Sequence, residues 1–212
     1  MGRREENKRR KHEALLAAGL AAFEADGYER ASIETIVREA GVARGTFYLY
    51  FEDKLALFRA LVLPWTDALA EVVGTVDRTI DQVTDRTGLA EVYEGMALQI
   101  AMLGLTHSQV ILLVFRELRG ATEAGAFLRD QEARLLGAAV QITAHARDRG
   151  LIRVKRPEVV ARMVLGATER MTFDLLTGAD LGPPLEVAAE VVELFSAALL
   201  QEGAGSEDPD AG

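Results

Sequence analysis

Residues 32–54 read SIETIVREAGVARGTFYLYFEDK, and this stretch carries the signals of two short helices joined by a tight turn. Ser32 is a favoured N-cap residue, and the apolar residues that follow it recur at helical spacing. Gly41 can end this helix because glycine enters the left-handed backbone region without a steric penalty. The pattern therefore predicts a first short helix over residues 33–40.

A second short helix is predicted over residues 43–51, directly after the turn. Phe47 and Phe51 can anchor it to a core, while the basic and hydroxyl-bearing side chains around them face outward. Gly45 lies inside this helix, where glycine costs about 1 kcal/mol relative to alanine. A DNA backbone or base edge that approaches closely would explain its presence. The stretch therefore predicts a helix-turn-helix whose second helix faces DNA.

From Leu15 to Phe58 the sequence resembles the DNA-binding domain of TetR-family transcriptional regulators. The residues that match the family pattern are Ala18, Leu20, Phe23, Gly27, Tyr28, Ser32, Ile36, Ala40, Gly41, Val42, Gly45, Thr46, Phe47, Tyr48, Tyr50, Phe51, Lys54, Leu57 and Phe58. The resemblance implies an all-α fold with an N-terminal three-helix DNA-binding domain. It also implies a C-terminal helical domain for ligand binding and dimerisation.

The composition favours the same all-α class. The 212 residues are 49% hydrophobic with a mean hydropathy of +0.07, which fits a globular protein with a sizeable core. No run alternates apolar and polar residues for long enough to require a sheet. We expect a DNA-binding domain over residues 1–54, which begins with a basic arm over 1–11. A helical effector-binding and dimerisation domain over 55–201 and a disordered tail over 202–212 complete the expected organisation.

Charge is distributed unevenly along a chain whose net charge is −9. Residues 1–54 carry ten Lys/Arg and ten Asp/Glu, whereas residues 55–212 carry fourteen and twenty-three. Six of the basic residues lie within the first twelve positions. Such a terminus would orient the chain on a polyanion, or it is a solvated, disordered end, and both interpretations stay open.

Arg44 is the residue that we predict to read a base, since its planar guanidinium matches the two major-groove acceptors of guanine. A phosphate contact is the alternative. By resemblance, Tyr48 and Lys54 bind phosphates, although Tyr48 and Tyr50 can also be ordinary packing aromatics. Ser32 and the first amides of its helix offer a further phosphate site. The predicted DNA-binding residues are Ser32, Arg44, Gly45, Thr46, Tyr48, Tyr50 and Lys54.

The last two predicted helices carry more apolar surface than one partner can cover. The helix after Pro157 has two apolar stripes, and the final helix after Pro183 has a heptad seam. We therefore predict a four-helix bundle completed by a second copy of the chain, as the family resemblance also implies. The predicted interface residues are Val160, Met163, Ala167, Met171, Leu185, Ala188, Val192, Phe195 and Leu199. A two-fold dimer places its two recognition helices roughly 34 Å apart, so the operator should be an inverted repeat.

The resemblance further implies a pocket for a small, largely apolar effector in the helical domain. The candidate lining residues are Trp65, Met96, Met102, His107, Phe115, Arg116, Met163, Arg170 and Phe173. Ordinary core packing is the alternative for each apolar member, because methionine at helical spacing commonly fills gaps. An ion pair or simple exposure is the alternative for Arg170.

Several functional classes are disfavoured by what the sequence lacks. The chain has no cysteine, and its three histidines are isolated from one another, so neither a catalytic thiol nor a metal site is expected. No phosphate loop, zincin helix or nucleophile elbow occurs, so we expect neither an enzyme nor a cofactor. A cytoplasmic protein without a membrane segment is the expectation, because no apolar run is long enough to span a bilayer.

The sequence therefore predicts a homodimeric repressor that a small effector releases from DNA. The alternative is a DNA-bound structural or partner-recruiting protein of the same fold without an effector.

Overall fold

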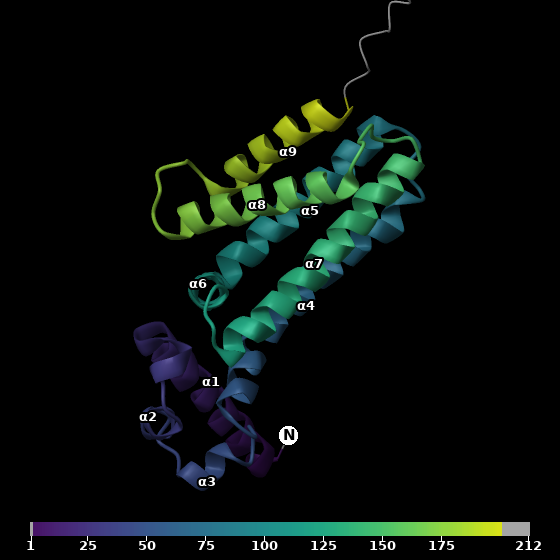
Figure 1. Ribbon diagram of the computed structural model, residues 1–212. Helices are drawn as coiled ribbons and strands as arrows, with labels where there is room; N and C mark the ends of the chain where they lie inside the picture. Colours follow the sequence, from purple (N-terminus) through teal and green to yellow (C-terminus); the bar gives the residue numbers. More distant parts are fainter. Residues whose placement is uncertain (1, 201–212) are drawn as a thin grey trace, which may run out of the picture. The chain divides into compact units, whose positions relative to one another are not determined.

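The computed structural model describes residues 2–200, with side chains described to residue 198, and within this range it contains helices and no strand (Figure 1). The helices are α1 (Arg3–Arg30), α2 (Ile33–Glu39), α3 (Arg44–Phe47), α4 (Lys54–Ile80), α5 (Arg86–Thr106), α6 (Ser108–Glu117), α7 (Glu123–Asp148), α8 (Pro157–Leu176) and α9 (Pro184–Leu200). The expected all-α class is confirmed. The expected tail over residues 202–212 lies outside the described residues, as does the side chain of Leu199.

The chain divides into two compact units, which we describe separately. The first unit comprises residues 1–71 and 102–135, and the second comprises residues 72–101 and 136–212. The expected DNA-binding segment over 1–54 lies wholly within the first unit. The expected domain boundaries themselves stay predictions, since compactness alone does not define a functional domain.

The first unit is built around an aromatic core. Phe23, Phe47 and Phe58 are fully buried, and the rings of Phe23 and Tyr28 both meet Phe58 edge-on, at centroid distances of 5.6 Å and 5.4 Å. Edge-to-face contacts of this kind stabilise beyond the burial of their area. This core holds α1, α2, α3 and the start of α4 together, and it therefore fixes the position of the turn between α2 and α3.

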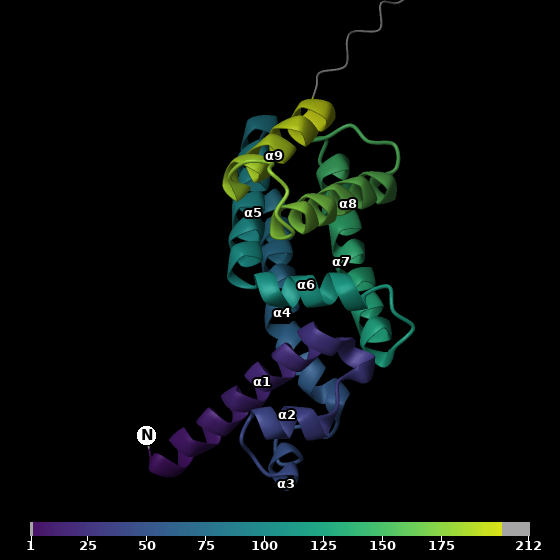
Figure 2. The ribbon, with the colours of Figure 1, turned by 90° about the vertical axis from the view of Figure 1, so that its left-hand side faces the viewer.

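Gly27 interrupts α1 near its C-terminal end. Its backbone has φ 78° and ψ 164°, a conformation that is open almost only to glycine. One further turn follows, and the Ala31 N–H donates to the Gly27 carbonyl at 3.1 Å. At its other end α1 begins at Arg3, so residues 3–11 of the expected basic arm are helical. In Figure 2 these N-terminal turns extend past α2.

The predicted second short helix is wrong in length. α3 covers only Arg44–Phe47, and residues 48–50 form a turn in which the Tyr50 N–H donates to the Phe47 carbonyl at 2.9 Å. Gly45 and the aromatic residues after it have low helix propensity, which does not favour continuing the helix. Phe51 is nevertheless buried as expected, because the turn returns it to the core.

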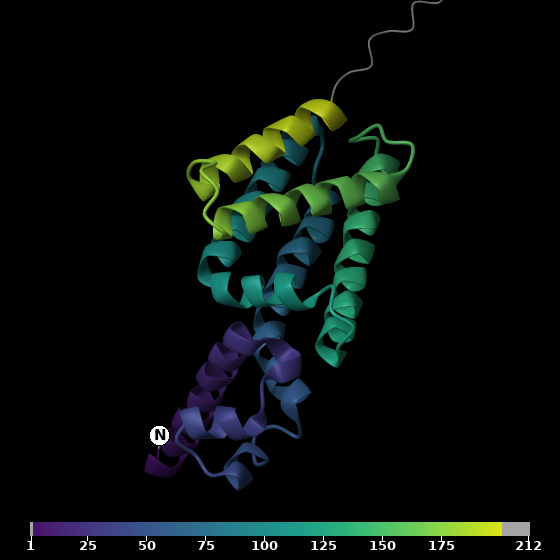
Figure 3. The same cartoon turned by 60° about the vertical axis from the view of Figure 1, so that its left-hand side comes forward.

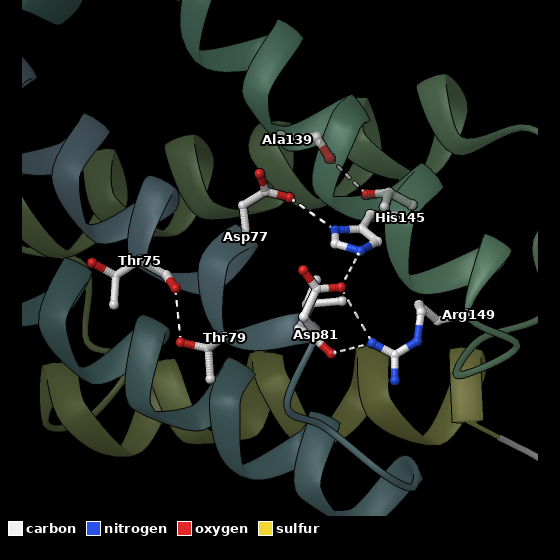
Figure 4. A network of polar contacts seen from close by, with 9 residues as sticks. Thr75, Asp77, Thr79, Asp81, Ala139, His145 and Arg149 are labelled. Atoms are coloured by element: carbon white, nitrogen blue, oxygen red, sulfur yellow. Dashed lines mark hydrogen bonds and ion pairs between the residues drawn. The ribbon is translucent and has the colours of Figure 1, made fainter.

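The second unit contains α8 and α9, which lie side by side in Figures 1 and 3. It also contains a polar network between α4 and α7 (Figure 4). The His145 ring lies between two carboxylates of α4, with Nδ1 3.2 Å from Asp77 Oδ1 and Nε2 3.0 Å from Asp81 Oδ1. Arg149 donates to the carbonyls of Ile80 and Val83, each at 3.1 Å. These contacts join the end of α4 to the end of α7.

Candidate nucleic-acid interface

The turn between α2 and α3 is fixed by local backbone geometry. Ser32 caps α2, since its Oγ accepts the Thr35 N–H at 3.1 Å. Gly41 adopts φ 64° after α2, and the Val42 N–H donates back to the Val37 carbonyl at 3.0 Å. This closes the helix end as glycine at that position predicts.

α3 has one buried face and one exposed face. Phe47 is fully buried, whereas Arg44, Gly45 and Tyr48 are exposed. A Cβ placed on Gly45 would meet no atom within 4 Å, so no intramolecular contact requires glycine there. Leu49, which the sequence interpretation passed over, is 80% exposed at the end of this face. The arrangement leaves a small, open helical surface that a flat partner can approach closely.

Arg44 is held by two neighbours on this surface. Its Nη1 lies 2.6 Å from Glu34 Oε1 of α2, and both side chains are exposed. A side-chain hydrogen bond with Tyr48 raises the pKa of Arg44 above its ordinary value, and the negative charge of Glu34 adds to the shift. The Arg44 guanidinium is therefore oriented on this surface by its contact with Glu34. Sequence interpretation missed Glu34, although an acidic residue in the first turn of α2 was visible.

Three of the seven predicted DNA-binding residues are engaged elsewhere in the first unit. The Lys54 Nζ donates to the carbonyls of Tyr28 at 2.7 Å, Glu29 at 3.1 Å and Ala31 at 3.0 Å. An ammonium group has three donors, so Lys54 is saturated by the end of α1. Tyr50 donates its hydroxyl to the Lys8 carbonyl at 3.0 Å, and Ser32 serves as the cap. Direct contact of these three residues with DNA stays a prediction.

The N-terminal turns of α1 carry a basic face near the segment that follows α3. Arg4, Lys8 and Lys11 recur at spacings of four and three residues, which places them on one side of the helix. Glu13 lies on another side and pairs with Arg9 at 3.5 Å. The Tyr50–Lys8 hydrogen bond ties this part of α1 to the segment that follows α3.

A long-range contact within the first unit joins α6 to the end of α1, and it was not predicted from the sequence. Glu117 of α6 is 7% exposed, and its Oε1 accepts the backbone N–H of Tyr28 at 3.0 Å. Arg116 donates from Nη1 to the Glu24 carbonyl at 2.5 Å. Burial, and then the nearby Glu123 carboxylate, raise the pKa of the Tyr28 phenol, whose hydroxyl lies 3.3 Å from Glu123 Oε2. α6 is thereby bonded to the end of α1.

The predicted effector residues are divided between the two units. The first unit holds Trp65, Met102, His107, Phe115 and Arg116, and the second holds Met96, Met163, Arg170 and Phe173. Arg116 is committed to α1, and Arg170 Nε pairs with Asp174 at 2.8 Å. Met102 and Met163 are exposed. The effector site therefore stays a prediction.

The predicted dimer residues all lie on α8 and α9, and the two apolar stripes of α8 differ in their surroundings. The stripe that includes Val160, Ala167 and Met171 is half-buried within the chain. The other stripe, formed by Val159, Met163, Gly166 and Phe173, is exposed, and Met163 is 59% accessible. On α9 Leu185 is exposed, whereas Ala188, Val192 and Phe195 are half-buried. Dimerisation through these helices stays a prediction.

Two other features of the described residues bear on function. Between residues 2 and 200, no group of three or more His, Asp or Glu side chains is arranged to hold a metal ion. No single helix in that range is long and apolar enough to cross a membrane, and only the bent pair α5 and α6 reaches that length and composition jointly.

Residues 15–61 match the family profile described as bacterial regulatory proteins of the tetR family. The chain is 41% identical over 76 residues to YvdT, an uncharacterized HTH-type transcriptional regulator of Bacillus subtilis, in a match covering 36% of this chain and 34% of YvdT. It is 26% identical over 195 residues to a second such B. subtilis regulator, YdgC, covering 89% and 92% of the two chains.

The fold is shared with solved regulators. The crystal structure of the transcriptional regulator FadR from B. subtilis in complex with stearoyl-CoA aligns with a TM-score of 0.66 at 17% identity. The alignment covers 87% of this chain and 97% of FadR. Residues 15–61 therefore form a segment of the tetR family of bacterial regulatory proteins, and the helical fold of the chain is that of solved transcriptional regulators.

Proposed function

We propose that this chain is a homodimeric transcriptional repressor that binds an inverted-repeat operator through α3 and is released by a small, largely apolar effector. The exposed face of α3 carries the proposal, because Arg44, Gly45 and Tyr48 combine charge, close access and hydrogen-bonding capacity on one surface. Thr46 is half-buried beside them. We assign base contact to Arg44 and phosphate contact to Tyr48.

The dimer is supported by the exposed stripe on α8. Val159, Met163 and Phe173 leave apolar area uncovered, and a second copy can bury it symmetrically. Two copies are also needed to place two short recognition helices in successive major grooves. An effector with a long apolar portion is supported by FadR, whose structure holds stearoyl-CoA, an apolar acyl chain joined to a charged coenzyme.

The function is tested by selecting bound duplexes from a random DNA pool and measuring affinity for the selected site. We expect an inverted repeat, and an affinity that falls steeply with salt because counterions are released on binding. Arg44→Ala should weaken binding to that site by about 1–3 kcal/mol. Arg153→Ala, at an exposed loop position of the second unit, is the matched control and should leave affinity unchanged. Absence of an enriched sequence would overturn the proposal.

The proposed response to an effector is tested with stearoyl-CoA as the probe and coenzyme A as its control. Stearoyl-CoA should raise the unfolding temperature and release the selected duplex, since a ligand shifts a conformational equilibrium only when it binds the two states unequally. Stabilisation without release would argue against effector control of DNA binding. A failure of stearoyl-CoA and of a broader lipophilic library would favour the structural or partner-recruiting alternative.

A further inference from the structure

Glu34 is an acidic residue on a surface proposed to meet DNA, and its presence there needs a reason. It stands in the first turn of α2, and its Oε1 lies 2.6 Å from Arg44 Nη1 of α3. An exposed carboxylate near phosphates opposes DNA binding through like-charge repulsion. An acidic side chain does suit a helix N-terminus, but that preference does not require it to reach a residue of the next helix.

Fold stability does not supply the reason. The side chains of Glu34 and Arg44 are 60% and 61% exposed, and exposed ion pairs contribute little to folding. α2 and α3 already have their own anchors, since Ile36 and Phe47 are fully buried. The ion pair therefore affects the exposed surface of α3, where it orients Arg44, and contributes little to the stability of the core.

The geometry of the pair suits base recognition. Free arginine side chains sample many rotamers, and a guanidinium must be oriented to place two donors on the two acceptors of guanine. Glu34 engages Nη1, and an arginine has five donors, so donors remain for a base edge. A guanidinium that is already held in place loses less conformational freedom on binding. It also discriminates more strongly between bases, because it cannot reorient to suit a base whose acceptors do not match its donors.

We propose that Glu34 is a positioning residue that holds the Arg44 guanidinium for base readout, so that Glu34 governs discrimination between sequences while its charge weakens binding to every duplex. This rests on the proposed function, because it presumes that α3 enters the major groove. It assigns to α2 a part in sequence recognition without any contact between Glu34 and a base.

The test compares Glu34→Gln with wild type on the selected duplex, on duplexes altered at the base pair that Arg44→Ala identifies, and on random DNA. Glu34→Gln should bind random DNA several-fold more tightly and should lose about tenfold of the preference for the correct base pair. Glu39→Gln is the matched control, since Glu39 is an exposed carboxylate of the same helix that pairs with its neighbour Arg38 at 3.4 Å. It should leave the preference intact.

A double variant separates positioning from a general charge effect. In an Arg44→Ala background, Glu34→Gln should change the preference no further, because nothing is left to position. Equal loss in Glu34→Gln and Glu39→Gln, an unchanged preference in Glu34→Gln, or a loss that persists without Arg44 would each overturn the proposal. If the wild type selects no sequence, the proposed function itself fails. If the wild type selects a sequence and Glu34→Gln keeps the same preference, only the proposal for Glu34 fails.

Discussion

At the scale of single residues, Lys54 was predicted to bind a DNA phosphate, and in the structure it donates hydrogen bonds to backbone carbonyls of the chain itself. Its ammonium group satisfies three carbonyls at the end of α1, so we expect Lys54→Met to destabilise the protein by about 1–3 kcal/mol. For a chain of this length the unfolding temperature should fall by about 2–4 °C for each kcal/mol. Lys155→Met, at an exposed loop position, is the control. An unchanged melting temperature with a salt slope reduced by about one would instead identify Lys54 as a phosphate ligand.

His145 gives the second unit a dependence on pH. Hydrogen bonds that the His145 ring donates to the Asp77 carboxylate, and then to that of Asp81, raise the pKa of His145 above its ordinary value of 6.5. A group whose pKa is raised by folding stabilises the protein fully below the unfolded pKa, and this contribution is lost as pH rises through the folded pKa. We expect stability to fall as pH rises from about 6.5. His145→Gln, which cannot titrate, should flatten this part of a urea-denaturation profile, and an unaltered profile would contradict the assignment.

At the scale of elements, the junction between α1 and α6 depends on Gly27. A Cβ there would lie 3.2 Å from both Arg116 Nη2 and Glu117 Oε1, and the backbone conformation itself excludes other residues. Gly27→Ala should therefore destabilise the protein by about 1–3 kcal/mol or more. Gly137→Ala is the matched control, because Gly137 lies inside α7 with open space around its Cα. That change should stabilise by about 0.5–1 kcal/mol. Thermal unfolding of both variants checks the pair, and equal effects would refute the assignment.

The same junction shows where prediction from sequence ends. The contacts of Ser32 and Gly41 are made with residues a few positions away, so the cap and the turn follow from local chemistry. Glu117 instead meets a backbone amide 89 positions away, and no local pattern encodes such a partner. α3 was predicted too long because the apolar spacing of Phe47 and Phe51 fits both a helix and a turn.

At the scale of the whole molecule, assembly of two copies is the property that the proposed function needs most. The exposed stripe of α8 predicts that Met163→Asp converts dimers to monomers, since it places a charge at the centre of the proposed contact. Light scattering after size exclusion measures this, and affinity for the selected repeat should fall in parallel. Leu98→Asp, which alters an exposed leucine of α5, is the control and should remain dimeric. A dimeric Met163→Asp protein would exclude this face.

The two apolar stripes of α8 could be predicted from sequence, because they follow from helical spacing. Which stripe the chain itself covers is a tertiary property that spacing does not encode, and the dimer interface stays a prediction. The effector site stays a prediction for a related reason. Its candidates come from helices that are distant in sequence, and composition alone does not distinguish a pocket wall from a packed core.

The exposed stripe on α8 also bears on gene dosage. If single chains must meet before they occupy an operator, promoter occupancy follows the square of the chain's concentration at low abundance. Halving the number of protein chains in a cell would then reduce operator occupancy about fourfold at low abundance. The rate at which the regulator is synthesised would therefore control repression alongside the effector.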